Sequence, residues 1–382
     1  MKKLLIIILF FTISNILYGE NKIIFLIGEP YSEVLAKSIK KLKISNNVTF
    51  FVRKDFKNLT RNDFKNYKIF LVDTMYPSTF DVLKLLPSDA KIYSLRTEKG
   101  GSLRKTNKKL IYDTKLIQYF QFPCLQNTIN LLKYIMNKEL GKNYKISPPI
   151  KTPLAFLAHP ESDKIFTDIK EYINWYKKST HFHKDGFWVA ICYYKPMLND
   201  SLIKEVVKRF EDNGINVIVS YSFPDYIAVR KFLLKSPVRV SFFVAILYKF
   251  SASLDEKGKN SLIELNVPVY NAISLFQSSK KQWELSDVGL TPFEVSFQIS
   301  MPELGGIVEP TVIGSKEKIY LPELQKDIYV SRMIDYQVDW LIKRIKKMHE
   351  SYKLSLTERK RLLLSITITI LASKILEQAI LM

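Results

Sequence analysis

The chain has 382 residues, of which 47% are hydrophobic and 25% charged, so it can bury the cores of two or three ordinary domains and is not a disordered protein. Its formal net charge is +21, but the lysines are scattered and no stripe of basic and aromatic residues repeats, which argues against a nucleic-acid partner. The only cysteines, Cys124 and Cys192, exclude a disulfide framework and a cysteine zinc site, and we expect two buried thiols rather than one disulfide.

The first nineteen residues are typical of a secretory signal peptide. Lys2 and Lys3 precede an apolar run from Leu4 to Phe11, and the segment ends at Gly19. The run is too short for a stable membrane span. We therefore expect residues 1–19 to be a signal peptide and the protein to be exported to the periplasm. Because no A-x-A box is present, an uncleaved inner-membrane anchor is the alternative.

Residues 20–110 are predicted to form a first α/β domain, because apolar runs typical of buried strands alternate with helical patterns. The runs lie at Lys22–Ile27, Val48–Val52, Lys68–Asp73 and Lys91–Leu95, and Tyr31–Leu42 is an amphipathic helix. Strands separated by helices imply a parallel sheet covered by helices. Gly28 follows the first run as a lone glycine and does not make a dinucleotide-binding fingerprint.

Residues 111–153 are predicted to be a helical segment, within Tyr112–Leu140, followed by a proline-rich linker. A second α/β region is expected over residues 154–360. Its expected elements are a strand at Phe156–Ala158, a helix at Ser162–Lys177, a strand at Phe187–Tyr193, a helix at Asp200–Asn213 ended by Gly214, strands at Ile215–Tyr221, Phe242–Tyr248 and Val267–Ile273, a less regular strand at Phe293–Met301, and a basic helix at Val330–Ser351. The predicted fold class is α/β, with consecutive Rossmann-like parallel-sheet domains and covering helices.

Five short sequence words follow one another in the second region. They are His159-Pro160-Glu161 with Phe166 and Tyr172–Tyr176, then Trp188–Tyr194, Leu265–Val269, Trp283-Glu284 with Gly289–Pro292, and Ser300–Gly306. In this order and spacing they resemble blocks of the CobN/BchH family, the large subunits of cobaltochelatase and magnesium chelatase. The resemblance covers about residues 120 to 360, and the first 110 residues are similar to the family only at the level of fold. Gly305 departs from the pattern, because the family has an aspartate there.

Residues 361–382 do not resemble the family, although a family block is expected at this point. A one-base slip in the codons of Glu358-Arg359-Lys360 would place them out of frame. Back-translated and shifted by two bases, the tail reads KIAIIYNYNYPGKQNIGASYLN, which is similar to the family block. We therefore expect an out-of-frame tail and an N-terminal fragment of the subunit, and an ordinary C-terminal helix is the alternative.

The resemblance implies a tetrapyrrole substrate and a divalent metal ion that is inserted or removed, with cobalt expected first and magnesium or iron as alternatives. It also implies that ATP acts only through separate AAA+ chelatase subunits. This division is consistent with the sequence, in which no ATP-binding motif is visible. For an exported protein, an outer-membrane haem or metal uptake system is the alternative partner. The fragment alone is expected to be inactive.

Two residues are predicted to carry the chemistry. His159 follows a strand and is expected to be a metal ligand, since neutral imidazole binds divalent cations. Glu303 is expected to follow a strand and to accept pyrrole protons, with Glu309 as a weaker second carboxylate. The alternatives are a loop histidine that caps the next helix and a glutamate in a surface turn.

Further residues could surround a macrocycle. Gly305 and Gly306 would let the backbone approach a flat ligand. Trp175, Tyr176 and Trp283 could stack on it, although core packing is the commoner fate of such side chains. The pair His181-x-His183 offers only two ligands, so we expect a surface loop there. The rival functions are a non-catalytic periplasmic binding protein with two α/β lobes, which holds a tetrapyrrole or metal complex, and a basic interaction protein.

Overall fold

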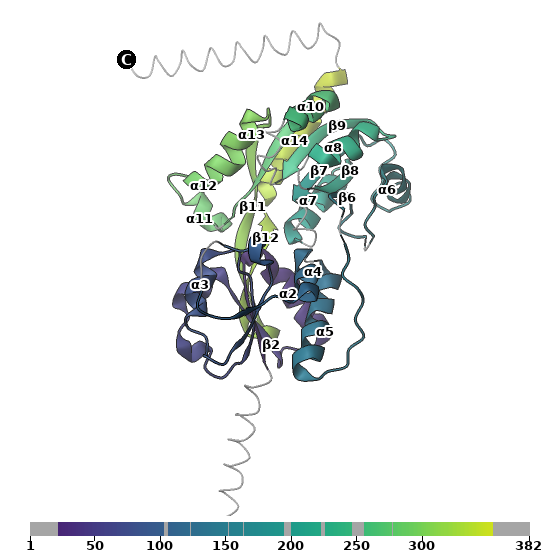
Figure 1. Ribbon diagram of the computed structural model, residues 1–382. Helices are drawn as coiled ribbons and strands as arrows, with labels where there is room; N and C mark the ends of the chain where they lie inside the picture. The colour runs from purple at the N-terminus through teal and green to yellow at the C-terminus, as the bar shows by residue number, and fades with distance from the viewer. Residues whose placement is uncertain are drawn as a thin grey trace, which may run out of the picture.

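The computed structural model describes residues 22–353, apart from 103–105, 123, 152, 163, 195–199, 223–225, 247–255 and 277. The predicted signal peptide at residues 1–19 and the predicted out-of-frame tail at 361–382 lie outside the described residues. The described chain forms two α/β lobes, one above the other in Figure 1. Among the described helices, none combines the length and the apolar character needed to cross a bilayer.

The first lobe is a five-stranded parallel sheet with the order β2-β1-β3-β4-β5. Its elements are β1 (Ile23–Ile27), α2 (Glu29–Leu42), β2 (Val48–Val52), β3 (Ile69–Val72), α3 (Pro77–Leu83), β4 (Lys91–Ser94), β5 (Leu110–Ile111), α4 (Thr114–Gln121) and α5 (Leu125–Leu140). The central strand β1 reads IIFLI and is buried throughout, because helices cover both faces of a parallel sheet. The helices α4 and α5 pack into the core on one face of this sheet.

The second lobe is a seven-stranded sheet with the order β12-β11-β10-β9-β7-β8-β6. Its four inner pairings, from β8 to β11, are parallel, and the edge strands β6 and β12 run antiparallel to their neighbours. Its strands are β6 (Ala155–Leu157), β7 (Trp188–Tyr194), β8 (Asn216–Ser222), β9 (Val240–Ile246), β10 (Val269–Ser274), β11 (Val308–Leu321) and β12 (Lys326–Met333). Its helices are α6 (Ile169–Tyr176), α7 (Ser201–Asp212), α8 (Tyr226–Lys231), α10 (Glu256–Leu265), α11 (Lys280–Glu284), α12 (Pro292–Val295), α13 (Met301–Leu304) and α14 (Asp335–Lys353).

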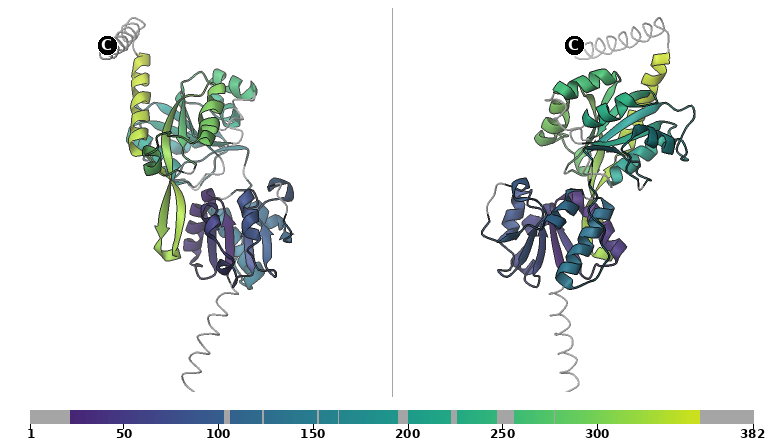
Figure 2. Two further views of the ribbon diagram at one scale, coloured as in Figure 1. Left: turned by 90° about the vertical axis from the view of Figure 1, so that its left-hand side faces the viewer. Right: turned by 45° about the vertical axis from the view of Figure 1, so that its right-hand side comes forward.

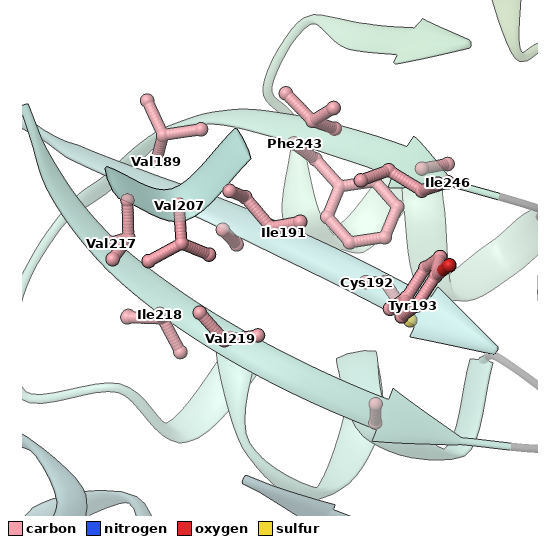
Figure 3. Close-up of a cluster of buried hydrophobic side chains, with 14 of the residues drawn as sticks. Val189, Ile191, Cys192, Tyr193, Val207, Val217, Ile218, Val219, Phe243 and Ile246 are labelled. Carbon is pink, nitrogen blue, oxygen red and sulfur yellow. The ribbon is translucent and has the colours of Figure 1, made fainter. Parts of the chain in front are cut away.

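The core of the second lobe surrounds β7, as Figure 3 shows. Val189 and Ile191 of β7 lie among apolar side chains of β8, β9 and α7, and these side chains are almost fully buried. Cys124 and Cys192 are buried thiols that are not joined in a disulfide. The predicted α/β class with consecutive parallel sheets is therefore confirmed, as is the expected state of the cysteines.

Three predicted elements were wrong in extent or type. The helix expected from Ser162 begins only at Ile169, because the Asp168 carboxylate caps it by accepting the Glu171 N–H at 2.9 Å. The segment Phe293–Met301 is helical rather than extended, since Thr291 and Glu294 form a capping box that starts α12.

The predicted basic helix at Val330–Ser351 starts too early. Val330 belongs to β12, and α14 begins at Asp335. Among the described strands, β12 and the second half of β11 pair with each other beyond Gly314, where the pairing of β11 with β10 ends. They form a two-stranded ribbon that leaves the second sheet and lies against the first lobe, as Figure 2 shows. Figure 2 also shows that this ribbon connects the two lobes in addition to the linker after α5.

Candidate functional site

Both sheets have a switch point, where the chain changes the side on which it adds strands. In the first lobe β2 lies on one side of β1 and β3 on the other. In the second lobe β8 lies on one side of β7 and β9 on the other. Ligands of open α/β sheets bind outside the carboxyl ends of the strands at such points. The fold therefore offers two candidate positions, one in each lobe.

The two switch points face each other. The strand β11 runs toward the first lobe, where Leu321 packs against its core, and β10, β9, β7 and β8 run parallel to β11. The Ser201 hydroxyl, at the start of α7 after β7, donates a hydrogen bond to the Glu33 carboxylate, in α2 after β1. We call the region between the two sets of carboxyl ends the junction.

On the first-lobe side of the junction, Arg96 forms a forked pair with the fully buried Asp73. Its Nε and Nη2 atoms lie 2.8 and 3.1 Å from the two carboxylate oxygens, and Nη2 also donates to the Tyr31 hydroxyl at 2.8 Å. Burial opposes the charge of Arg96, but the hydrogen bonds that the guanidinium donates to Asp73 and Tyr31 outweigh burial and raise its pKa. This pair fixes the carboxyl ends of β3 and β4 side by side.

The Tyr76 ring covers the first-lobe switch point. An added Cβ at Gly28 would lie 2.4 Å from the Tyr76 Oη atom, so only glycine lets the ring approach β1 this closely. The Arg53 guanidinium lies 4.7 Å from the centre of the same ring, and Arg53 Nε donates to Glu29 at 3.2 Å. Burial, followed by the nearby Asp73, raises the pKa of the Tyr76 hydroxyl, which therefore stays neutral at physiological pH.

On the second-lobe side, Asp200 caps α7 by accepting the Leu202 N–H at 3.0 Å. Burial raises the pKa of this carboxyl; Lys316 opposes the rise and Glu33 adds to it. The pKa of Tyr193, at the carboxyl end of β7, is raised by burial and then by Asp200. The Lys316 ammonium donates to the Ser331 hydroxyl on β12. Acids, bases and neutral phenols thus meet at the junction, where they can orient a polar ligand and exchange protons.

The predicted metal ligand His159 does not lie at the junction. It follows β6, which is antiparallel, so it sits at the amino ends of the parallel strands, the opposite edge of the sheet. Both ring nitrogens are engaged: Nδ1 accepts the Glu161 N–H at 3.2 Å, and Nε2 lies 3.0 Å from Glu211 Oε1. The ring is 2% exposed. In this geometry His159 fastens the loop after β6 to α7.

The predicted stacking residues Tyr176 and Trp175 surround His159. The Tyr176 hydroxyl donates to Glu211 Oε1 at 2.8 Å and accepts the Val217 N–H at 3.4 Å. Trp175 packs against the His159 ring, with the ring centres 5.3 Å apart. His181 joins the cluster, since its Nδ1 atom lies 3.4 Å from Glu211 Oε2. The first family word therefore builds a buried polar cluster inside the fold.

Tyr172 and Tyr176 also replace part of a strand. The short strand β6 pairs only with Ser220–Ser222 of β8. Beside it, the Tyr172 hydroxyl donates to the Val217 carbonyl at 3.2 Å and accepts the Val219 N–H at 3.3 Å. These phenols satisfy backbone groups of β8 that no strand reaches.

The remaining predicted residues lie on the other side of the second lobe. Glu303 is exposed in the short helix α13 rather than following a strand. Gly305 caps this helix, and Gly306 has φ of +80°, the left-handed conformation that ends it. Trp283 is partly buried against a small apolar cluster around Ile273.

The structure therefore brings His159, Trp175 and Tyr176 together but separates them from Glu303, Gly305, Gly306 and Trp283, which belong to elements beyond the opposite side of the sheet. The metal-binding, catalytic and tetrapyrrole-binding roles of these residues stay predictions. Within the described ranges, no three His, Cys, Asp or Glu side chains are grouped so that they could hold a metal ion.

Sequence reasoning missed the junction residues. Asp73 ends one predicted strand, Arg96 follows another and Asp200 begins a predicted helix, so their positions near strand ends were visible in the sequence. The sequence did not show that the strand ends of the two lobes face each other and so bring these residues to one junction.

Comparison with known proteins shows the family to which the sequence is similar. A family model described as CobN/Magnesium Chelatase matches residues 117–368. A magnesium-chelatase subunit of Chlorobaculum parvum is 24% identical over 246 residues, which cover 61% of this chain and 18% of that protein. The chloroplastic magnesium-chelatase subunit ChlH of Oryza sativa subsp. indica is 26% identical over 260 residues, covering 62% of this chain and 17% of that protein.

A solved structure has the same fold. The catalytic subunit of cobaltochelatase from Mycobacterium tuberculosis superimposes with a TM-score of 0.51 at 17% sequence identity, covering 84% of this chain and 26% of that one. The chain thus spans about a fifth to a quarter of the length of these proteins.

Proposed function

Because the chain belongs to the CobN/magnesium chelatase family, whose model matches residues 117–368, we propose that it is part of a metal chelatase large subunit and binds a tetrapyrrole at the junction. The observation that carries the proposal is the facing of two switch points, each of the kind at which α/β proteins bind ligands. A divalent metal ion is the second substrate. Cobalt, magnesium and iron are the candidates, in that order.

The junction suits a flat ligand with carboxylate groups. Arg53 is 31% exposed beside the Tyr76 ring, so it offers a charged group and an aromatic surface together. A guanidinium binds carboxylates through paired hydrogen bonds, whereas an aromatic ring contacts the face of a conjugated ligand. The neutral Tyr76 and Tyr193 hydroxyls and the Asp200 carboxyl provide donors and a proton acceptor nearby.

Titration with a free-base porphyrin that carries carboxylates tests this site, with fluorescence quenching as the readout. We expect Arg53→Gln to weaken binding about tenfold, which corresponds to about 1.4 kcal/mol. Arg230→Gln is the matched control, because Arg230 is also partly exposed and also lies near a glutamate, Glu264, but sits away from the junction on α8. Equal affinities of the two variants, or no binding by the parent protein, would refute the proposal.

Metal insertion is tested separately by absorbance, since the spectrum of a free-base porphyrin changes when a metal enters. Co²⁺, Mg²⁺ and Fe²⁺ are added in turn, with and without AAA+ chelatase subunits and ATP. We propose that ATP acts only through those partners. Metal insertion in the absence of both the AAA+ subunits and ATP would contradict this proposal.

A second candidate function is a non-catalytic binding protein for a tetrapyrrole or metal complex. The observation that favours it is the pair of α/β lobes that meet at their ligand-binding edges. Tight porphyrin binding without insertion of any of the three metals, even with partner subunits, would support this function over chelation.

We also propose that the protein is exported, on the basis of residues 1–19. Mass spectrometry of the N-terminus after cell fractionation tests this. A mature chain that starts near residue 20 in the periplasmic fraction agrees with signal cleavage, whereas an intact N-terminus in the membrane fraction indicates an anchor.

A further inference from the structure

The ribbon formed by β11 and β12 reaches across the junction. Beyond Gly314, β11 pairs with β12 alone among the described strands of the second sheet, in register from Gly314↔Met333 to Leu321↔Lys326. The Lys316 N–H also donates to the Ser278 carbonyl at 3.0 Å, so β11 is still attached to the second lobe at its base. Seven residue steps in an extended strand span about 23 Å. The ribbon is therefore long enough to leave one lobe and cover a side of the other, as Figure 2 shows.

The far part of the ribbon is buried in the first lobe. Ile328, Tyr329 and Val330 are 5 to 8% exposed and belong to the same apolar cluster as β1, β2 and α2. Ile319 and Leu321 pack against this cluster from the opposite strand of the ribbon. The core of the first lobe is thus completed by residues that follow it in the chain by about 200 positions.

Polar contacts fix the same surface in register. The buried Ser32 hydroxyl of α2 donates to the Tyr329 carbonyl at 2.9 Å and accepts the Tyr329 N–H at 3.2 Å. Lys40 of α2 pairs with Glu323 at the ribbon turn at 2.6 Å. The hydrogen bonds with Ser32 satisfy the outward N–H and carbonyl of Tyr329, as a neighbouring strand would.

The base of the ribbon, at Arg332 and Met333, is anchored in the second lobe. The Met333 N–H donates to Glu205 of α7 at 2.8 Å, and the other carboxylate oxygen of Glu205 lies 2.7 Å from Arg332 Nε. Because both ends are anchored in packed cores, rotation of one lobe against the other would break contacts at one end of the ribbon.

We infer that the ribbon is a strut that sets the distance between the two switch points, so that the junction is preformed and the lobes do not close around a ligand as separate bodies. In a binding protein that closes about a hinge, the backbone angles of a few hinge residues change while the two domains move as rigid bodies. Such a protein has few other contacts between its domains. Here a strand pair with one face packed on the first lobe crosses the junction in addition to the linker after α5.

The inference is tested in ligand-free protein by measuring the distance between spin labels at the exposed positions Lys65 and Lys235, one in each lobe, after Lys65→Cys and Lys235→Cys substitution. We expect a single narrow distance distribution. Tyr329→Ala should broaden it or add a second distance. Tyr320→Ala is the matched control, because Tyr320 lies on the same ribbon but is 58% exposed, and it should leave the distribution unchanged.

A broad or double distribution in the parent protein, or a Tyr329→Ala variant as narrow as the Tyr320→Ala control, would overturn the strut. If Tyr329→Ala does not fold, Ser32→Ala takes its place, because it removes both hydrogen bonds to the Tyr329 backbone and no apolar surface. Since these distances are measured without porphyrin, their result is independent of the titration that tests the proposed function.

Discussion

Replacing His159 by alanine tests whether this residue holds the fold together or holds a metal ion. The imidazole is 2% exposed, and its Nε2 atom lies 3.0 Å from Glu211, which is itself 4% exposed. Loss of a hydrogen bond to a buried carboxylate costs about 1.5 to 3 kcal/mol. A ring-sized cavity beside Trp175 adds about 1.5 kcal/mol, at about 24 cal/mol per Å³. We therefore expect the free energy of unfolding to fall by about 3 to 4.5 kcal/mol.

The assay is urea unfolding followed by circular dichroism and tryptophan fluorescence, with the slope checked to be unchanged. His183→Ala is the control, because His183 joins the fold through hydrogen bonds of its backbone N–H and carbonyl with Asn216. We expect a change below about 0.5 kcal/mol for this variant. If His159→Ala keeps the parent stability and loses Co²⁺ binding in equilibrium dialysis, the structural role is refuted and the metal-ligand prediction is supported.

Four further predictions concern residues of both lobes. Asp200→Asn keeps a good helix cap and should be more stable than the parent at pH 7, because burial raises the pKa of Asp200; the gain should vanish below the ordinary pKa of 3.8 in unfolding curves at pH 3 and 7. Asp113→Asn should be less stable than the parent at pH 7. Burial raises the pKa of Asp113, but hydrogen bonds from Lys138, the α4 backbone and Tyr134 outweigh burial and lower it. The stability that Asp113 contributes is therefore present above pH 3.8 and is lost as the pH falls through the folded pKa. Gly28→Ala should cost about 1 to 3 kcal/mol by forcing the Tyr76 ring away, and a double-mutant cycle with Tyr76→Ala should remove most of that cost; additive effects would show that the ring is not the obstacle. Glu303→Gln should change the unfolding free energy by less than about 0.5 kcal/mol and leave porphyrin affinity unaltered; a loss of metal insertion with retained porphyrin binding would support its predicted catalytic role.

Most strands of the two sheets were predictable from the sequence because they are continuous apolar runs. The run at Val48–Val52 coincides with β2. The run at Lys68–Asp73 extends one residue beyond β3 at each end, and the run at Lys91–Leu95 extends one residue beyond the end of β4. Burial on both faces leaves no room for polar residues in such strands, so the local signal is strong.

The direction of a short strand was not predictable in the same way. Ala155–Leu157 is three apolar residues, which fit a parallel or an antiparallel pairing equally well. Because β6 pairs antiparallel with β8, the residue that follows it lies at the edge away from the junction. His159 was therefore assigned to a ligand-binding edge by sequence position and is found in a buried cluster instead.

The ribbon was missed for a related reason. The segment from Val308 to Met333 contains charged residues such as Lys316, Glu317 and Lys318, which hide the strand pattern. Val330 and its neighbours are apolar because they fill the core of the other lobe, a contact that no local pattern records.

Tyr172 and Tyr176, beside β8, affect whether this chain can associate with other copies through its sheet edge. A strand with open N–H and C=O groups at the side of a sheet invites pairing with a second polypeptide and so promotes aggregation. Here the phenol groups of Tyr172 and Tyr176 occupy the sites to which such a strand would bond. A second strand cannot add to β8 at this point. Tyr176, which was predicted to stack on a macrocycle, and Tyr172 thus help to protect the chain from aggregation.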